Sequence, residues 1–182
     1  MMEKVVLREQ RTRLTDEEVI ARCPWATTGR THHRTPNIIT SLELDPAEME
    51  KRNIHLQKKY AEIEENEVRF EELHCEDAEY LIVAFGSCAR IAQKAMEMAR
   101  EEGIKVGLLR PITLWPFPSK AIAARAAQVK GILTVELNAG QMVEDVRLAV
   151  ECKVPVEHFG RLGGIVPDPD EVITALKEKL IK

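Results

Sequence analysis

Aromatic residues are scarce in this chain of 182 residues. The sequence contains two tryptophans, two tyrosines and four phenylalanines, which together make up 4% of it. Aliphatic side chains and alanine must therefore form most of the core. Hydrophobic residues account for 45% and charged residues for 31%, which is ordinary for a globular protein. The length fits one domain with additional elements rather than two full domains.

Cysteine is also sparse, and no two cysteines are close in the sequence. The four lie at Cys23, Cys75, Cys88 and Cys152 without any CxxC pair, which argues against a locally built iron–sulfur or zinc site. So few cysteines in a chain of this length also argue against a disulfide framework. No apolar run approaches the roughly 20 residues that span a bilayer, and the first residues do not resemble a signal peptide. We therefore expect a reduced, cytoplasmic protein that does not contact a membrane.

The chain has no excess of positive charge. Its formal net charge of −4 argues against a nucleic-acid surface. The negative charge is concentrated in residues 1–78, which hold 12 basic and 17 acidic residues. This asymmetry predicts a solvated N-terminal segment attached to a compact C-terminal domain.

The pattern divides the chain into three parts. Residues 1–44 show no periodicity and are interpreted as an irregular arm. A linker helix is predicted over residues 45–67, because Asp45, Pro46 and Glu48 have the order of a capping box with proline at the first helical position. Its apolar residues recur at helical spacing in one narrow stripe, which is typical of a bridging or interface helix. Residues 68–182 are predicted to form an α/β domain.

Strands and helices alternate in this third part. Strands are predicted at 68–73, 80–85, 106–109, 132–135 and 156–159, and helices follow the last four of them. Such alternation implies parallel strands joined by right-handed crossovers, and hence a three-layer α/β sandwich. Ligands of such sheets bind at the carboxyl ends of the strands, so the turns there are the candidate sites.

The first of these turns contains Ser87 and Cys88 at the start of a predicted helix. A thiol in this position is favoured as a thiolate, which is one route to a nucleophile. The alternative interpretation is structural, with Ser87 as the helix cap and Cys88 as a small buried residue. His158 follows another strand, and nothing in the sequence shows that it lies near Cys88.

The second turn is rich in proline and aromatic residues. Pro111, Pro116 and Pro118 stiffen the segment, and it displays two of the eight aromatic side chains, Trp115 and Phe117. Stiff loops with aromatic residues are favoured at interfaces. Arg110, Trp115 and Phe117 are therefore the candidate interface residues, although both rings could instead pack against their own domain.

The remaining turns contain small and amide residues. Asn138, Gly140 and Gln141 join a strand to a helix whose first amide groups could hold an anion. Gly163 and Gly164 likewise permit a close approach of a ligand. These residues are candidates for a small-anion or nucleotide site, and a plain loop is the alternative.

Three of these segments carry a resemblance to a known family. LRPITLWPFP at 109–118, VELNAGQM at 135–142 and GRLGGIVPDPDE at 160–171 resemble the alpha-type subunit of 2-oxoacid:ferredoxin oxidoreductases. CPWATTGR at 23–30 and NIITSLELDPAEMEKRN at 37–53 resemble the stretch just upstream in its branched-chain version, which acts on 2-ketoisovalerate (3-methyl-2-oxobutanoate). The resemblance covers nearly the whole chain and follows the C-terminal part of that subunit.

The resemblance implies a fold like the transketolase C-terminal domain. That fold has a five-stranded, mostly parallel sheet with one antiparallel edge strand, here the strand at 68–73. It also implies an oxidoreductase complex that uses thiamine diphosphate, magnesium, iron–sulfur clusters and coenzyme A. The implied partners are thiamine-binding, ferredoxin-like and gamma-type subunits, with ferredoxin reached through the complex.

The chain also departs from the family. It has no Gly-Asp-Gly thiamine motif and no cysteine cluster, and it starts at what resembles an internal point of the longer subunit, as expected for a truncated or split product. We therefore expect no catalytic, cofactor or metal residue in this chain. The expected function is assembly and support of the active site within the complex, as a homo- or hetero-oligomer. A free-standing cysteine enzyme using Cys88, or a small-anion module, are the alternatives.

Overall fold

The computed structural model describes residues 12–26 and 38–181. The chain divides into two compact units, Met1–Glu50 and Lys51–Lys182. No helix in the described ranges is long and apolar enough to cross a membrane.

The first unit contains a short helix that the sequence analysis did not predict. Helix α1 (Asp16–Arg22) lies within the segment interpreted as an irregular arm. A capping box starts it, because the Thr15 hydroxyl accepts from the Glu18 amide and the Glu18 carboxylate accepts from the Thr15 amide at 2.8 Å. The helix has seven residues and buries none of them, so it lacks the apolar periodicity by which helices are recognised.

Helix α2 (Pro46–Asn66) agrees with the predicted linker helix. The Asp45 carboxylate accepts hydrogen bonds from the amides of Ala47 at 2.8 Å and Glu48 at 3.2 Å. Asp45 thus satisfies two amide groups that have no partner within the helix, as an N-cap residue does. The helix buries none of its side chains.

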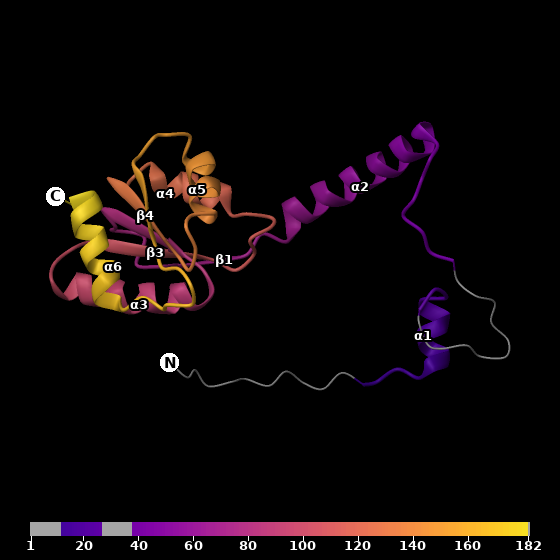
Figure 1. Cartoon of the computed structure of the whole chain (residues 1–182), viewed down its shortest axis with the longest axis horizontal. Helices are drawn as coiled ribbons and strands as arrows, with labels where there is room; N and C mark the ends of the chain where they lie inside the picture. Colours follow the sequence, from indigo (N-terminus) through magenta and orange to yellow (C-terminus); the bar gives the residue numbers. More distant parts are fainter. Residues whose placement is uncertain (1–11, 27–37, 182) are drawn as a thin grey trace. The chain divides into compact units, whose positions relative to one another are not determined.

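The second unit is built around one five-stranded sheet, shown in Figure 1. Its strands are β1 (Phe70–Leu73), β2 (Tyr80–Ala84), β3 (Val106–Pro111), β4 (Gly131–Glu136) and β5 (Val156–Gly160). They lie in the order β1-β3-β2-β4-β5. β1 pairs antiparallel with β3, and the other pairs are parallel. The predicted mostly parallel sheet with one antiparallel edge strand is confirmed.

Helices cover both faces of this sheet. α3 (Gly86–Glu101) and α6 (Pro169–Leu176), continued by a short π-helix η1 (Lys177–Ile181), share one core cluster with the sheet. α4 (Ser119–Ala126) and α5 (Met142–Val150) contribute to the other. The two separate clusters establish the predicted three-layer α/β sandwich.

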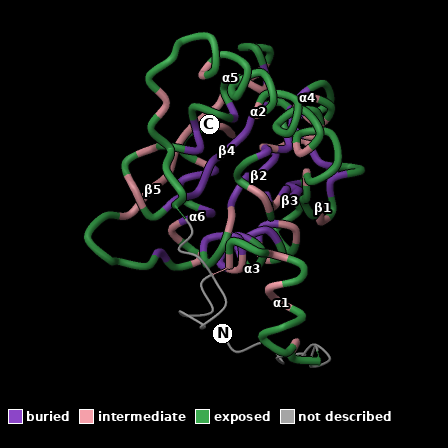
Figure 2. The backbone as a smooth tube through the Cα atoms, turned by 90° about the vertical axis from the view of Figure 1, so that its right-hand side faces the viewer, coloured by how far each residue is buried: buried purple, intermediate pink, exposed green. Residues whose placement is uncertain are grey.

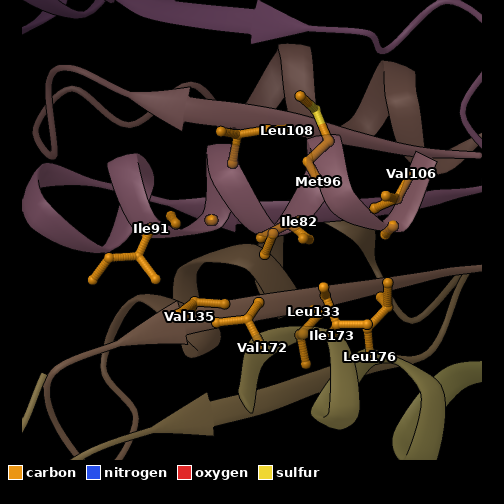
Figure 3. Packing of buried hydrophobic residues seen from close by; sticks show 14 of the residues in the cluster. Ile82, Ile91, Met96, Val106, Leu108, Leu133, Val135, Val172, Ile173 and Leu176 are labelled. Atoms are coloured by element: carbon orange, nitrogen blue, oxygen red, sulfur yellow. The ribbon is translucent and has the colours of Figure 1, made fainter. Parts of the chain in front are cut away.

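The core is aliphatic, as the scarcity of aromatic residues requires. Figure 3 shows one side of it, a cluster that contains Met96 and Ile91 of α3, Val172 and Leu176 of α6 and the sheet residue Leu133. Burial is greatest along the central strands in Figure 2. Every residue of β4 is buried, including the polar Thr134 and Glu136, so this strand is covered on both faces.

An ion pair attaches the antiparallel edge strand to the helix layer. Arg125 of α4 donates to both carboxylate oxygens of Glu72 in β1, at 2.9 and 2.6 Å. This bidentate hydrogen bonding from Arg125 lowers the pKa of Glu72. Both side chains are about three-quarters buried, and the pair thus helps to hold the short strand β1 in place.

Candidate functional site

A hydrogen-bonded cluster of side chains, the Glu136 cluster, lies at the carboxyl end of β4 and consists of Glu136, His158 and Thr134. Glu136 is the last residue of β4, and its side chain is fully buried. Its carboxylate accepts hydrogen bonds from the amides of Gln141 at 3.2 Å, Met142 at 2.9 Å and Val143 at 3.0 Å. These are amides at the start of α5, where the helix favours negative charge. The carboxylate of Glu136 therefore occupies the position at the start of α5 where an anion would otherwise bind.

His158 of β5 lies beside Glu136. Its Nδ1 is 3.4 Å from Glu136 Oε1 and 3.3 Å from the Thr134 hydroxyl. Its Nε2 is 3.3 Å from the carbonyl oxygen of Asn138. The Thr134 hydroxyl in turn donates to the Glu157 carbonyl at 3.2 Å. The imidazole thus joins the end of β4 to the turn that follows it.

Gly160 makes room for this imidazole. A Cβ atom on Gly160 would lie 2.2 Å from the Asn138 carbonyl oxygen and 2.6 Å from His158 Nε2. Neither separation is compatible with van der Waals contact. Only glycine therefore fits at the end of β5, because the neighbouring turn and ring approach its backbone directly.

The predicted anion site at Asn138, Gly140 and Gln141 falls on this turn. The Asn138 side chain accepts from the Gly140 amide at 2.7 Å, and Gly140 has a φ of +114°, which favours glycine. The Gln141 amide is bound to Glu136. The free amides on which the anion prediction depended are therefore occupied by the chain's own groups.

The sequence analysis did not name Glu136, His158 or Gly160 as site residues. A signal for the first was present, because Glu136 is a charged residue that closes an apolar strand directly before a helix. A charge in that position needs partners when it is buried. No comparable pattern marks His158 or Gly160, whose roles depend on the pairing of β5 with β4.

Ser87 does not cap helix α3, contrary to the structural interpretation of the first turn. α3 begins at Gly86 with Phe85 as the N-cap residue, and no side chain makes a capping hydrogen bond. Gly86 turns the chain with a φ of +57°. Ser87 is exposed, whereas Cys88 is buried with 4% exposure. The second half of that interpretation, Cys88 as a small buried residue, agrees with the structure.

The surroundings of Cys88 do not favour a nucleophile. Burial, and then the negative charge of Glu136, raises the pKa of the Cys88 thiol. A nucleophilic cysteine needs the opposite shift and a base. The imidazole of His158 is directed to Glu136, Thr134 and Asn138. The free-standing cysteine enzyme is therefore not supported.

Thiol labelling is expected to follow exposure in the folded chain. Iodoacetamide at neutral pH should modify the exposed Cys152 and leave Cys88 and Cys75 unmodified, as read by peptide mass spectrometry. Burial raises the pKa of both buried thiols, that of Cys75 to about 11, which keeps them neutral. Labelling in urea is the control, because all thiols are then accessible. Rapid labelling of Cys88 in the native chain would contradict this account.

Gly163 and Gly164 lie in an open loop between β5 and α6. Both have positive φ, +65° and +84°, and a Cβ on either would meet no atom within 4 Å. Arg161 just before them pairs with Glu171 of α6 at 2.9 Å. These glycines thus lie in a turn that requires their conformational freedom. Neither of them takes part in the hydrogen bonds around Glu136.

The three candidate interface residues occupy different environments. Trp115 is 54% exposed, and its ring makes an edge-to-face contact with Tyr60 of α2, with 5.6 Å between centroids. Phe117 is half-buried and packs against the core cluster on the α4 and α5 side. Arg110 is half-buried and pairs with Glu71 at 3.2 Å. Trp115 therefore has the exposure that an interface residue needs, whereas Phe117 belongs partly to its own core.

The hydrogen bonds of Glu136 and His158 hold the backbone of the turn after β4 and the start of α5. No buried side-chain nitrogen or oxygen lacks a hydrogen-bond partner in the described ranges. Nor do the described residues contain a group of three or more histidine, cysteine, aspartate or glutamate side chains that could hold a metal ion. The polar groups at this edge satisfy one another, and they hold the turn at 137–141 in one conformation.

These features define the class of protein as an α/β sandwich of the transketolase type. Solved structures with this arrangement include a 2-oxoglutarate:ferredoxin oxidoreductase from Magnetococcus marinus, with a TM-score of 0.66 and 24% identity over 81% of this chain and 27% of that one. A split-gene transketolase also matches, with a TM-score of 0.54 and 17% identity over 81% of this chain and 46% of that one. At these identities the likeness concerns the fold.

Sequence comparison identifies the family. The model of pyruvate:ferredoxin oxidoreductase core domain II matches residues 78–172. The chain is 46% identical over 89% of its length to the ketoisovalerate oxidoreductase subunit VorB of Methanothermobacter thermautotrophicus, and 45% identical over 85% to that of Methanothermobacter marburgensis. It is 32% identical over 77% of its length to the 2-oxoglutarate synthase subunit KorA of Archaeoglobus fulgidus, of which it covers 40%. The chain belongs to the 2-oxoacid:ferredoxin oxidoreductase family. It spans 46% and 43% of the two VorB subunits, about half their length.

Proposed function

We propose that this chain is part of a thiamine-diphosphate-dependent 2-oxoacid:ferredoxin oxidoreductase that acts on 2-ketoisovalerate. Its role in the complex is assembly and support of the active site, and the chain does not catalyse the reaction by itself. The predicted cytoplasmic location is part of the same proposal.

The observation that carries the substrate is the difference in identity among relatives. The two ketoisovalerate subunits are 46% and 45% identical over at least 85% of this chain. The 2-oxoglutarate synthase subunits are 31–35% identical over at most 77% of it. A pyruvate synthase subunit is 32% identical over 37%. The similarity to ketoisovalerate subunits is thus both higher and more extensive.

The turn after β4 supports placing thiamine diphosphate outside this chain. A diphosphate needs free amides or cations, but the amides at the start of α5 are bound to the carboxylate of Glu136, which repels a second anion. The described residues offer no cluster of carboxylates for magnesium. We propose that thiamine diphosphate, magnesium, iron–sulfur clusters and coenzyme A bind to other parts of the complex. The proposed partners are thiamine-binding, ferredoxin-like and gamma-type subunits, and ferredoxin is the electron acceptor.

The test is an assay of the complex purified through an affinity tag on this chain. The complex is expected to reduce ferredoxin with 2-ketoisovalerate at a kcat/KM at least about tenfold above that for pyruvate or 2-oxoglutarate, as the shape of a binding pocket permits. The chain purified alone serves as the control. It should show no 2-oxoacid-dependent reduction, and titration calorimetry with thiamine diphosphate and magnesium should show no binding.

Two results would contradict the proposal in different ways. Micromolar binding of thiamine diphosphate to the chain alone would show that this chain carries the cofactor site. A purified complex with higher kcat/KM for 2-oxoglutarate or pyruvate would leave the family intact but reject the substrate.

A further inference from the structure

The part of α2 in the second unit carries its charges in two blocks. Residues 51–59 contain four basic and no acidic residues, and residues 60–67 contain four acidic and no basic residues. None of the helix is buried. The side chains of Lys58, Lys59, Glu64 and Glu65 are therefore available to a neighbouring molecule, whereas Lys51 and Arg52 have interactions within the chain and Glu67 pairs with Arg69.

This order of charges opposes the dipole of the helix. Helices are stabilised by acidic residues near the N-terminus and basic residues near the C-terminus. The acidic block of α2 lies at its C-terminal end, and its last turn contains no basic residue. Lys58, Lys59, Glu64 and Glu65 also form no ion pair with the described part of the chain. These four side chains thus do not stabilise the helix that carries them.

An apolar seam follows the same segment. Leu56, Tyr60 and Ile63 recur at spacings of four and three residues, so they lie on one face of the helix. Leu56 and Ile63 are half-buried, and Tyr60 remains 39% exposed even with its edge-to-face contact to Trp115. The seam is narrow, as is usual for a helix that packs against one further helix.

A groove continues this seam at the acidic end of the helix. It has a volume of about 960 Å³ and lies between α2, the start of β1 and the loop after β3. Phe70, Trp115 and Phe117 supply apolar surface, Glu64 and Glu65 line it from α2, and Lys120 lines it from α4. Such a groove fits an amphipathic helix with an apolar face and flanking basic residues.

We propose that this surface binds the α2 helix of a second copy of the chain, in antiparallel orientation about a two-fold axis near Ala61. The basic block of each copy then lies against the acidic block of the other. Leu56 of the second copy comes to the groove, beyond Ile63. The same contact is made twice, as an isologous interface requires, and the antiparallel helix dipoles attract each other. Helix α2 thus has the apolar seam and the basic residues that would fit the groove. A second copy of the chain is therefore sufficient to explain the basic and acidic blocks.

Charge reversal tests this pairing in the full chain. Sedimentation equilibrium is expected to show a reversible dimer for the unmodified chain. The variant Lys58→Glu/Lys59→Glu should weaken it by at least about 100-fold, because like charges then oppose each other at both contacts. Glu64→Lys/Glu65→Lys should have the same effect. Trp115→Ala, which removes an aromatic residue from the groove, should weaken it by about 30-fold without moving the urea midpoint.

Mixing the two charge-reversed variants distinguishes this interface from any other. In the mixture, reversed lysines of one chain meet reversed glutamates of the other, and the second contact is unmodified. The mixture should therefore form a heterodimer although each variant alone is monomeric. A matched control, Lys94→Glu/Lys153→Glu, removes two lysines whose side chains are 57% and 62% exposed elsewhere, and it should leave the dimer unchanged.

Three results would overturn the proposal. They are an unmodified chain that stays monomeric at the highest concentration reached, dimers that persist in both charge-reversed variants, and a mixture that forms no heterodimer. None of these results depends on the enzymatic role of the complex, so this inference and the proposed function can fail separately.

Discussion

Replacement of Glu136 by alanine is expected to lower the free energy of unfolding by about 3–5 kcal/mol, because it leaves buried backbone donors without an acceptor. The carboxylate accepts three backbone hydrogen bonds, two of them from the buried amides of Met142 and Val143. Without it these amides have no acceptor, and each unsatisfied buried donor costs about 1–3 kcal/mol. His158 loses its charged neighbour at the same time. Urea denaturation followed by circular dichroism measures the change.

Two further variants show whether the loss comes from the hydrogen bonds. Glu136→Gln keeps one carbonyl oxygen as an acceptor, so its loss of stability should lie between that of the alanine variant and zero. Glu79→Ala removes a carboxylate whose side chain is 44% exposed in its pair with Lys130, and it should cost far less than the loss of Glu136. An alanine variant at 136 that is as stable as the unmodified chain would show that the amides of α5 find other partners.

Gly160→Ala is expected to destabilise the chain by about 3 kcal/mol, at the upper end of the cost of inserting a methyl group into packed surroundings. The added Cβ would lie 2.2 Å from the Asn138 carbonyl oxygen, which belongs to the backbone and cannot rotate away. The turn at 137–141 and the His158 ring must therefore move together. Urea denaturation measures the loss, and the NMR signals of the His158 imidazole report the displacement.

Gly131→Ala is the matched control for this prediction. Its added Cβ would meet only a terminal methyl of Leu180, at 2.8 Å, and that side chain can change rotamer. The control should cost less than the Gly160 variant, although Gly131 is the more buried of the two. Equal losses of stability in the Gly160 and Gly131 variants would show that the clash with the Asn138 carbonyl oxygen does not determine the cost at Gly160.

Both predictions concern a turn that is held in place by its own chain. In parallel α/β sheets the carboxyl edge is the usual place for ligands. In this chain a carboxylate and an imidazole occupy that edge and fix the loops beside it. We propose that this cluster supports the neighbouring surface in the complex and leaves the cofactor chemistry to other subunits, in agreement with the proposed function.

Much of the fold was predictable because periodicity reports burial directly. The apolar run at 80–85 predicted the strand that the structure has as β2, and the order of Asp45, Pro46 and Glu48 predicted the start of α2. Helix α1 was missed, because seven exposed residues produce no apolar period. Ser87 was wrongly taken as a cap, because Gly86 already turns the chain and begins the helix.

The sequence by itself determined the class of fold, the antiparallel edge strand and the family, since each depends on local pattern or on matching segments. Only the tertiary structure decided what happens at the strand ends. The register of β4 and β5 places Thr134 opposite His158 and Glu136 opposite Gly160, and from this pairing follow the ring beside the carboxylate and the need for glycine. The same folding lets Glu136 reach the amides of α5 that appeared free in the sequence. Contacts between residues more than 20 positions apart have no local signal, because pairing of separate strands sets them.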